Sequence, residues 1–189
     1  MKRIVIFASG SGTNAENIIT YFHNSTVATV IRVLSNNKDA KVLTRANNLK
    51  IKNLHFSKDN FFKTDKILKL LKEEADLIIL AGFLWKIPQK IITAFPRKII
   101  NIHPSLLPKY GGKGMYGMHV HQAVIENKEE ETGITIHFVN ENYDEGAIIF
   151  QKKIAISSKD TPESVANKIH VLEMKNFPKI IEKVILENG

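Results

Sequence analysis

The sequence of 189 residues contains no cysteine. Disulfide bonds, thiolate zinc sites and cysteine nucleophiles are therefore excluded. No apolar run approaches the roughly 20 residues that a membrane-spanning helix needs. The opening MKRIVIFASG has an apolar stretch too short for a signal peptide, and we interpret it as a first β-strand. These features predict a cytoplasmic protein without a membrane partner.

A dense basic tract is also missing, although the chain carries a formal net charge of +8. The lysines are spread along the whole sequence, which is typical of a solvated surface. An anionic partner is the alternative, either a nucleic acid or a small molecule with phosphate or carboxylate groups. The sequence shows no aromatic motif of the kind that stacks on single strands. We therefore expect no nucleic acid partner.

Strands and helices alternate in the first half of the sequence. We expect strands at 2–8, 27–35, 52–56 and 76–82, and helices at 15–24, 40–50 and 62–74. This alternation predicts a parallel sheet with right-handed crossovers. The continuous apolar run DLIILAG is typical of a strand that is covered on both faces.

The second half has a different pattern. A strand at 98–103 and a loop from Pro104 to Met118 precede a short helix at 119–127. The strands at 132–140 and 147–156 are too close for a parallel crossover, so we expect an antiparallel pair. A last helix begins near Thr161. The predicted fold is one α/β domain, residues 1–189, with a mixed, mostly parallel sheet and helices on both faces.

The stretch SGSGTNAENI, residues 9–18, is the first candidate site. Its glycines allow a sharp turn after the strand, and the amides that open the next helix suit a phosphate. The stretch is neither a Walker A loop nor the three-glycine dinucleotide pattern. A plain turn that Thr13 or Asn14 caps explains it equally well.

Two polar side chains end the apolar strand in NIHPSLLPKY, residues 101–110. Asn101 and His103 are two residues apart, so they project from the same face of the strand. Ligands of open α/β sheets bind at the carboxyl ends of strands. The pair therefore predicts a functional site at this end of the sheet.

The stretch GITIHFVNENYDEGAIIFQ, residues 133–151, is the third candidate. Thr135 and His137 share one face of a strand, and Asp144 follows in a loop with Gly146. Aspartate and glycine are ordinary turn residues, and this stretch alone favours a structural role for Asp144.

Five motifs together resemble the glycinamide ribonucleotide formyltransferases of purine biosynthesis, a folate-dependent family. They are SGSGTN, LAGFLWKIP, NIHPSLLPKYGGKGMYG, GITIHFVNENYDEGAIIFQ and HVLEMKNFP, in the order of that family. The resemblance covers essentially the whole chain. It implies a single-domain, Rossmann-like formyltransferase fold and 10-formyltetrahydrofolate as co-substrate, without a metal.

The resemblance also assigns roles to individual residues. It implies that Asn101, His103 and Asp144 are catalytic, with Asn101 also contacting the folate. The other implied contacts are Gly12, Thr13 and Asn14 with the phosphate, Glu173 with the ribose, and Leu84, Trp85, Lys86 and Ile87 with the pterin. The NENYD loop is expected to close over the pterin.

Formyl transfer places negative charge on the former carbonyl oxygen. The amide of Asn101 and a protonated His103 can stabilise that charge from one face of the strand. Histidine titrates near 6.5, so we expect the Asp144 carboxylate to raise the pKa of His103. Asp144 can also hold a water that carries the proton. Thr135 and His137 are interpreted as positioning residues, with strand packing as the alternative.

The chain departs from the family in three places. Trp85 and Lys86 stand where some relatives have an arginine and an aliphatic residue. The family also has an arginine before the LAGF strand, where this chain reads FFKTDK, and the sequence leaves open whether Lys63 replaces it. The insertion GGKGMYG, residues 111–117, has no assigned contacts. His119 and His121 follow this insertion, and for both a surface role is favoured over one at the substrate rim.

Three other functions would use part of this pattern. A formyltetrahydrofolate deformylase uses the same three residues but usually has an additional amino-terminal domain. A methionyl-tRNA formyltransferase needs an additional carboxyl-terminal domain. We therefore expect neither. A non-catalytic nucleotide-binding or RNA-binding domain would leave Asn101, His103 and Asp144 unexplained. The expected partners are the two small-molecule substrates, and the expected assembly is a monomer or homodimer.

Overall fold

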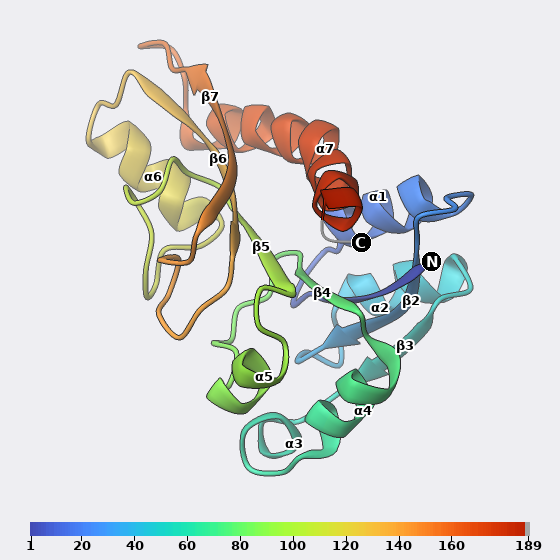
Figure 1. Ribbon diagram of the computed structural model, residues 1–189. Coiled ribbons are helices and arrows are strands. Elements are labelled where there is room, and N and C mark those ends of the chain that lie inside the picture. Colours follow the sequence, from blue (N-terminus) through green and yellow to red (C-terminus); the bar gives the residue numbers. More distant parts are fainter. Residues whose placement is uncertain (188–189) are drawn as a thin grey trace.

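The computed structural model describes residues 1–187, and seven strands form one sheet in the order β3-β2-β1-β4-β5-β6-β7 (Figure 1). The final two residues of the predicted domain, 188–189, lie outside the described residues. The strands are β1 (Lys2–Phe7), β2 (Ala28–Ser35), β3 (Lys52–His55), β4 (Leu77–Leu80), β5 (Ile99–His103), β6 (Glu131–Phe138) and β7 (Ile148–Ala155).

The sheet is mixed, as predicted. Strands β1 to β5 are parallel to one another. Strand β6 runs antiparallel to both β5 and β7, which confirms the expected carboxyl-terminal strand pair. The strand order reverses at β1, which has β2 on one side and β4 on the other. Such a switch point opens a crevice at the carboxyl ends of the strands.

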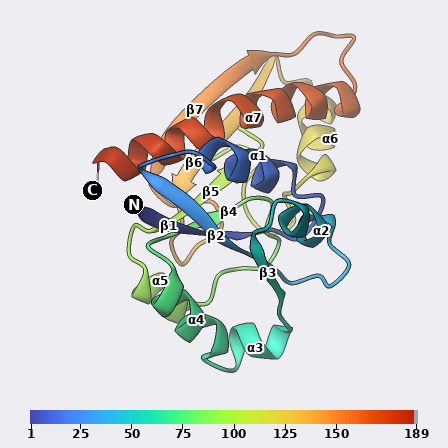
Figure 2. The ribbon, with the colours of Figure 1, turned by 90° about the vertical axis from the view of Figure 1, so that its right-hand side faces the viewer.

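Helices cover both faces of the sheet (Figure 2). Helices α1, α2 and α7 pack on one face, and α3, α4 and α5 pack on the other. Helix α6 packs against α7. The helices are α1 (Thr13–Phe22), α2 (Lys41–Asn48), α3 (Lys58–Phe62), α4 (Lys66–Glu74), α5 (Gln89–Ala94), α6 (Met118–Glu126) and α7 (Pro162–Glu187).

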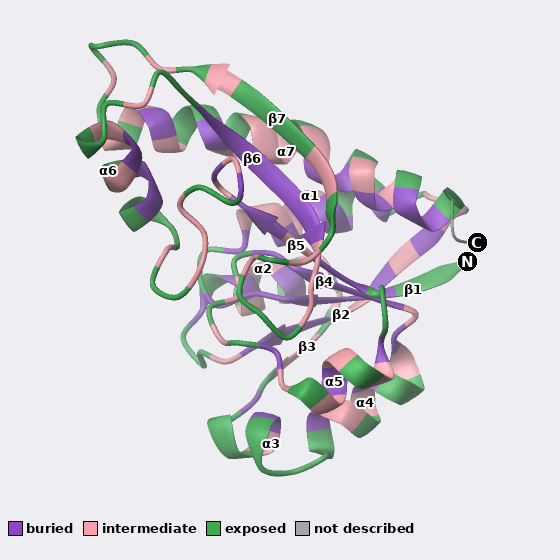
Figure 3. Cartoon of the chain, turned by 60° about the vertical axis from the view of Figure 1, so that its left-hand side comes forward, coloured by how far each residue is buried: buried purple, intermediate pink, exposed green. Residues whose placement is uncertain are grey.

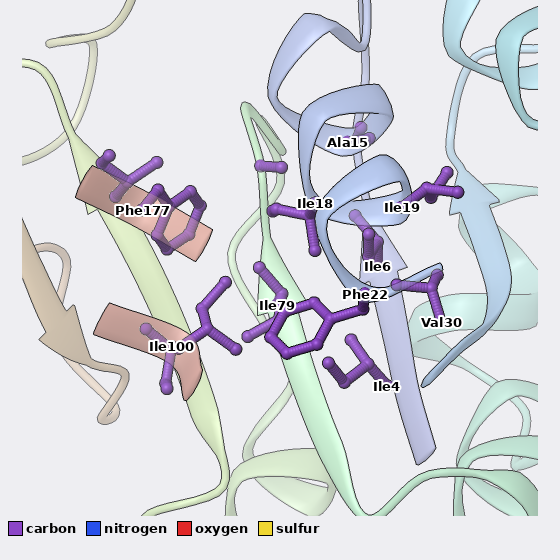
Figure 4. Close-up of a cluster of buried hydrophobic side chains, with 14 of the residues drawn as sticks. Ile4, Ile6, Ala15, Ile18, Ile19, Phe22, Val30, Ile79, Ile100 and Phe177 are labelled. Atoms are coloured by element: carbon purple, nitrogen blue, oxygen red, sulfur yellow. The ribbon is translucent and has the colours of Figure 1, made fainter. Parts of the chain in front are cut away.

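The core consists of two apolar clusters, one on each face of the sheet. Successive side chains of a strand point to opposite faces, so Ile4 and Ile6 of β1 join the first cluster, while its Val5 and Phe7 join the second. The central strand β4 is wholly buried, and most residues of β1 and β5 are buried (Figure 3). Figure 4 shows Phe22 of α1 directed toward Ile4 and the other side chains of the first cluster.

Two short helices were not predicted. Helix α3 has five residues, and its start is capped by the Ser57 hydroxyl, which accepts a hydrogen bond from the amide of Asn60 at 3.2 Å. Helix α5 has six residues and follows Pro88. Neither is long enough to show a helical period in the sequence. The helix expected at 62–74 begins at Lys66, because Phe62 belongs to α3.

Candidate active site

A pocket of about 920 Å³ opens where β1, β4 and β5 end. It brings together most of the residues that the sequence singled out from distant segments. Those lining it are Gly12, Thr13, Asn14, Leu84, Asn101, His103, Asp144 and Glu173. The catalytic candidates and the phosphate-binding candidates therefore share one pocket.

The glycine-rich loop before α1 is held in place by α2. The amide of Val42 donates to the carbonyl of Gly10 at 3.1 Å, and Nε of Arg45 donates to the carbonyl of Ser11 at 2.9 Å. Gly12 precedes α1 in the left-handed conformation, with φ of 77°. The first amides of α1 have no acceptor within the helix, so they are available to an anion in the pocket.

Replacing Gly12 with alanine is expected to destabilise the protein. The new Cβ would lie 2.7 Å from the Cα of Val42 and would also overlap its side chain. The left-handed conformation costs an L-residue about 1–2 kcal/mol, and overpacking costs about 1–3 kcal/mol. Urea denaturation should therefore show a loss of at least about 2 kcal/mol. Gly10→Ala is the matched control, because its Cβ would meet no atom within 4 Å. Equal stability of the two variants would contradict the argument.

Glu173 of α7 lies at the same end of the pocket as the glycine-rich loop. Its Oε2 accepts a hydrogen bond from Nδ2 of Asn14 at 2.8 Å. The same oxygen lies 3.7 Å from Nδ1 of His170, and this contact raises the pKa of His170. Asn14 therefore links the start of α1 to the last helix, so the predicted phosphate and ribose contacts are adjacent.

Asn101 and His103 line the pocket from the end of β5. Nδ2 of Asn101 lies 3.1 Å from Nε2 of His137, which is its partner on β6. Nδ1 of His137 lies 2.8 Å from the carbonyl of Phe138, which can only accept. A neutral His137 therefore carries its proton on Nδ1 and accepts from Asn101 through Nε2. The second amide hydrogen of Asn101 stays available for a ligand.

Asp144 reaches this group from the loop between β6 and β7. Its backbone is left-handed, with φ of 55°. The carboxylate lies 3.5 Å from Nδ1 of His103 and 3.6 Å from Nε2 of His137. It also accepts a hydrogen bond from the amide of Gly112 at 2.9 Å. Asp144 thus contacts residues that are distant from it in the sequence. Such contacts support a role in the site, because an aspartate that only formed a turn would contact its neighbours along the chain.

The pKa of His103 is lowered, whereas the sequence predicted that Asp144 would keep the ring charged. The side chain is 5% exposed, and burial lowers its pKa more than the Asp144 carboxylate and the Tyr110 carbonyl raise it. The pKa of His103 is therefore below its ordinary value, and the ring is neutral at pH 7. The expected influence of Asp144 is present, but the desolvation of a buried imidazolium is larger.

The protonated nitrogen of the neutral His103 ring follows from its contacts. Nε2 lies 2.7 Å from the carbonyl of Tyr110, which can only accept, so Nε2 carries the proton. Nδ1 then faces Asp144 with a free lone pair. Burial raises the pKa of Asp144, but the nearby His137 and His103 rings and the hydrogen bond from the Gly112 amide lower it by more. Asp144 is therefore ionised at neutral pH.

Thr135 positions the loop that follows β5. Its hydroxyl donates to the carbonyl of Ser105 at 2.7 Å and accepts from the amide of Leu107 at 3.0 Å. Gln151 of β7 donates to the same hydroxyl at 2.9 Å. Thr135 does not line the pocket, so its contacts fix the loop after His103.

The four residues expected at the pterin line a second, smaller pocket of about 70 Å³. Leu84, Trp85, Lys86 and Ile87 form one side of it, and the loop that carries Asp144 forms another. The ring of Trp85 also packs 6.0 Å from those of Phe56 and Phe61. Nζ of Lys86 lies 5.4 Å from the centre of the Tyr143 ring. The segment and the loop therefore meet beside Asn101.

Sequence reasoning missed three residues of the large pocket. Ser9 is buried, and its hydroxyl donates to Oδ1 of Asn36 at 2.7 Å and accepts from the amide of Leu84 at 2.9 Å. It therefore links the segments that follow β1, β2 and β4. Lys113 lies in the inserted loop and lines the pocket. His121 is buried there too, so the surface role favoured for it is wrong. Of these three residues, only Ser9 had a usable signal in the sequence, namely its place two residues after the first strand.

The lysine that the sequence left open as a replacement for the family's arginine lies outside both pockets. Nζ of Lys63 lies 3.0 Å from Oδ1 of Asp59 in α3, and Lys63 lines neither pocket, so these contacts do not support it as a replacement. Within residues 1–187, no group of three His, Cys, Asp or Glu side chains could hold a metal ion. None of the helices in this part of the chain is long and apolar enough to cross a membrane.

Residues 2–181 match the family model of the formyl transferases. The chain belongs to this family. The phosphoribosylglycinamide formyltransferase of Haemophilus influenzae is 39% identical over 188 residues, which are 96% of this chain and 86% of that protein. The chloroplastic phosphoribosylglycinamide formyltransferase of Arabidopsis thaliana is 36% identical over 193 residues, which are 98% of this chain and 66% of that protein. The chain thus spans slightly less than two thirds of the chloroplastic relative.

The fold of this formyl transferase agrees with a solved structure. The phosphoribosylglycinamide formyltransferase of Bacillus halodurans superposes with a TM-score of 0.88 at 32% identity, covering 100% of this chain and 97% of that one. The predicted family and the Rossmann-like α/β fold are thereby confirmed. The names of the relatives fit formyl-group transfer in purine biosynthesis, and the family implies a folate-derived formyl donor.

Proposed function

We propose that this formyl transferase moves the formyl group of 10-formyltetrahydrofolate to the amine of glycinamide ribonucleotide. The products are formylglycinamide ribonucleotide and tetrahydrofolate. The observation that supports this best is the shared pocket. Asn101, His103 and Asp144 lie in it together with the glycine-rich loop and Glu173. The same pocket can therefore hold the ribonucleotide and carry out the transfer.

The reaction needs a neutral amine and an acceptor for its proton. The amine attacks the formyl carbon, a carbon–nitrogen bond forms, and the electron pair of the carbonyl moves to its oxygen. The free hydrogen of the Asn101 amide is available to that oxygen. The attacking nitrogen then loses a proton, directly or through a water held by Asp144.

Nδ1 of His103 is the group that receives this proton in our proposal. It is unprotonated, and the ionised Asp144 beside it favours the imidazolium once it forms. The positive ring then faces the oxyanion. When the bond to N10 of the folate breaks, N10 takes up the proton. His103 therefore begins and ends the cycle neutral, in contrast to a permanently charged donor.

One assay tests the proposed function. Purified protein is mixed with 10-formyltetrahydrofolate, with and without glycinamide ribonucleotide, and the folate product is followed. We expect tetrahydrofolate to form only when the ribonucleotide is present. Formate release at the same rate without the ribonucleotide would identify a deformylase instead. RNA binding that weakens steeply with salt, without formyl transfer, would favour the non-catalytic domain.

Lys113 is proposed to supply positive charge to the anionic substrates. Among the described residues that line the large pocket, it is the only lysine or arginine, whereas Asp144 and Glu173 are both acidic. Lys113→Gln is expected to raise the KM of the ribonucleotide about fivefold at low salt, and the effect should shrink as salt is added. Initial-rate kinetics at two ionic strengths measure it.

The matched control for Lys113 is Lys159→Gln, which makes the same change of charge in the exposed loop before α7. Its KM values should equal those of the wild type. If Lys113→Gln changed only the KM of the folate donor, the charge would belong to the glutamate tail of the folate. An unchanged KM for both substrates would contradict the proposed role of Lys113.

The remaining expectations stay predictions. They are the pterin contacts of Leu84 to Ile87, the cytoplasmic location, activity without a metal, a monomer or homodimer, and the absence of a nucleic acid partner. Gel filtration with light scattering measures the assembly. Activity that a chelator abolished and only a divalent ion restored would contradict the absence of a metal.

A further inference from the structure

His121 is a buried side chain that the catalytic steps above do not use. It lies in the first turn of α6 and is 5% exposed. The residue lines the large pocket, which also contains His103 and Glu173. A buried histidine of this kind normally has a hydrogen-bond partner, because leaving a polar group unpaired in the protein interior is unfavourable.

The contacts of the His121 ring show which nitrogen faces the pocket. Its Nδ1 is fully buried and has no hydrogen-bond partner among the described residues. Nε2 is not among the fully buried unpaired atoms, and no hydrogen bond to it forms within residues 1–187, so we infer that it is the ring nitrogen a ligand in the pocket can reach. Burial lowers the pKa of His121, although Glu173 raises it, so the ring is neutral. A buried N–H without an acceptor is rarer than a buried unpaired acceptor, which places the proton on Nε2.

The position of His121 selects the substrate atom. It lines one pocket together with Glu173 and His103, and the Glu173 carboxylate is close enough to raise its pKa. On the proposed function, Glu173 marks the ribose end of the ribonucleotide, and His103 marks its amine. The one oxygen between the ribose and the amine of glycinamide ribonucleotide is the carbonyl oxygen of the glycinamide arm.

We propose that His121 donates a hydrogen bond from Nε2 to the glycinamide carbonyl oxygen of the ribonucleotide. This contact rests on the proposed function and adds a substrate-positioning residue to it. It fixes the arm that carries the amine and directs the amine toward His103. His121 thereby recognises the amide of the substrate, which a simple ribose phosphate lacks.

Three substitutions of His121 test the contact. His121→Phe keeps a ring but removes the donor, so the KM of glycinamide ribonucleotide should rise about tenfold. The KM of the folate donor should not change. Binding of ribose 5-phosphate, measured by calorimetry, should also not change, because that compound has no glycinamide arm. His121→Gln places an amide N–H near the position of Nε2 and should restore most of the affinity.

The other variants separate this role from packing. His121→Asn places its amide near Nδ1 and should behave like His121→Phe. His119→Phe is the matched control, because His119 is exposed in the same turn and does not line the pocket. Thermal unfolding shows whether each variant is folded. A folded His121→Gln variant as impaired as His121→Phe would overturn the contact. Weaker ribose 5-phosphate binding by His121→Phe would overturn the choice of atom.

The test distinguishes this inference from the proposed function. If the wild-type protein transfers no formyl group to the ribonucleotide, the proposed function fails, and the assignment of His121 fails with it. If the wild type is active and His121→Phe keeps the wild-type KM for the ribonucleotide, then only the assignment of His121 fails.

Discussion

His103→Ala is expected to lower kcat by about three orders of magnitude, because the variant loses both the proton acceptor and the charge beside the oxyanion. The ribonucleotide should still bind with nearly the wild-type affinity. Its phosphate and ribose contacts are proposed to come from the glycine-rich loop and Glu173, and within residues 1–187 no hydrogen bond or ion pair joins these to His103. Single-turnover kinetics and calorimetry without folate measure the two quantities separately.

The control for His103 must account for its burial. Removing a buried ring leaves a cavity, so a loss of folding could imitate a loss of catalysis. His103→Gln retains most of the volume and a polar end, and it should be folded but as inactive as the alanine variant. A folded His103→Gln or His103→Ala variant with near-normal turnover would refute the role of His103.

Asp144→Asn is expected to lower kcat by about 10²- to 10³-fold, with a characteristic change in the pH profile. The substitution keeps the shape and an oxygen that can accept from the Gly112 amide, but it removes the negative charge. That charge raises the pKa of His103 against the effect of burial. Its loss disfavours the imidazolium that forms during the reaction.

The direction of the pH effect follows from the proposed mechanism. His103 must be neutral to accept a proton, so kcat/KM falls as the pH drops through the pKa of His103, which lies below 6.5. Removing the Asp144 charge lowers that pKa further. The acid limb of the profile should therefore move to lower pH in Asp144→Asn. A limb that moved to higher pH would instead support a His103 that must be charged.

Glu141→Gln is the matched control for Asp144→Asn. Glu141 lies in the same loop, is exposed and lines neither pocket. The substitution removes the same charge without touching His103, so both kcat and the acid limb should remain those of the wild type. A similar shift in this variant would show that the net charge of the loop, and not the Asp144 contact, controls the profile.

Local patterns and motifs were enough to predict the family, the alternating elements and the shared face of Asn101 and His103. Periodicity in a strand is local: residues two apart share a face whatever the rest of the chain does. The antiparallel pair also followed from local information, because its connection is too short for a crossover. The five motifs then pointed to formyl transfer before any contact was visible.

The surroundings of each group depend on how distant segments pack together, which no local pattern shows. Asp144 meets His103 because the loop between β6 and β7, in which Asp144 has a left-handed backbone, brings its carboxylate to the end of β5, and this contact joins residues 41 positions apart. Burial is a property of the whole fold, so the sequence predicted the sign of the Asp144 effect on His103 but not the larger opposing effect of desolvation. For the same reason the sequence favoured a surface role for His121. Its ring is buried because α6 packs against α7.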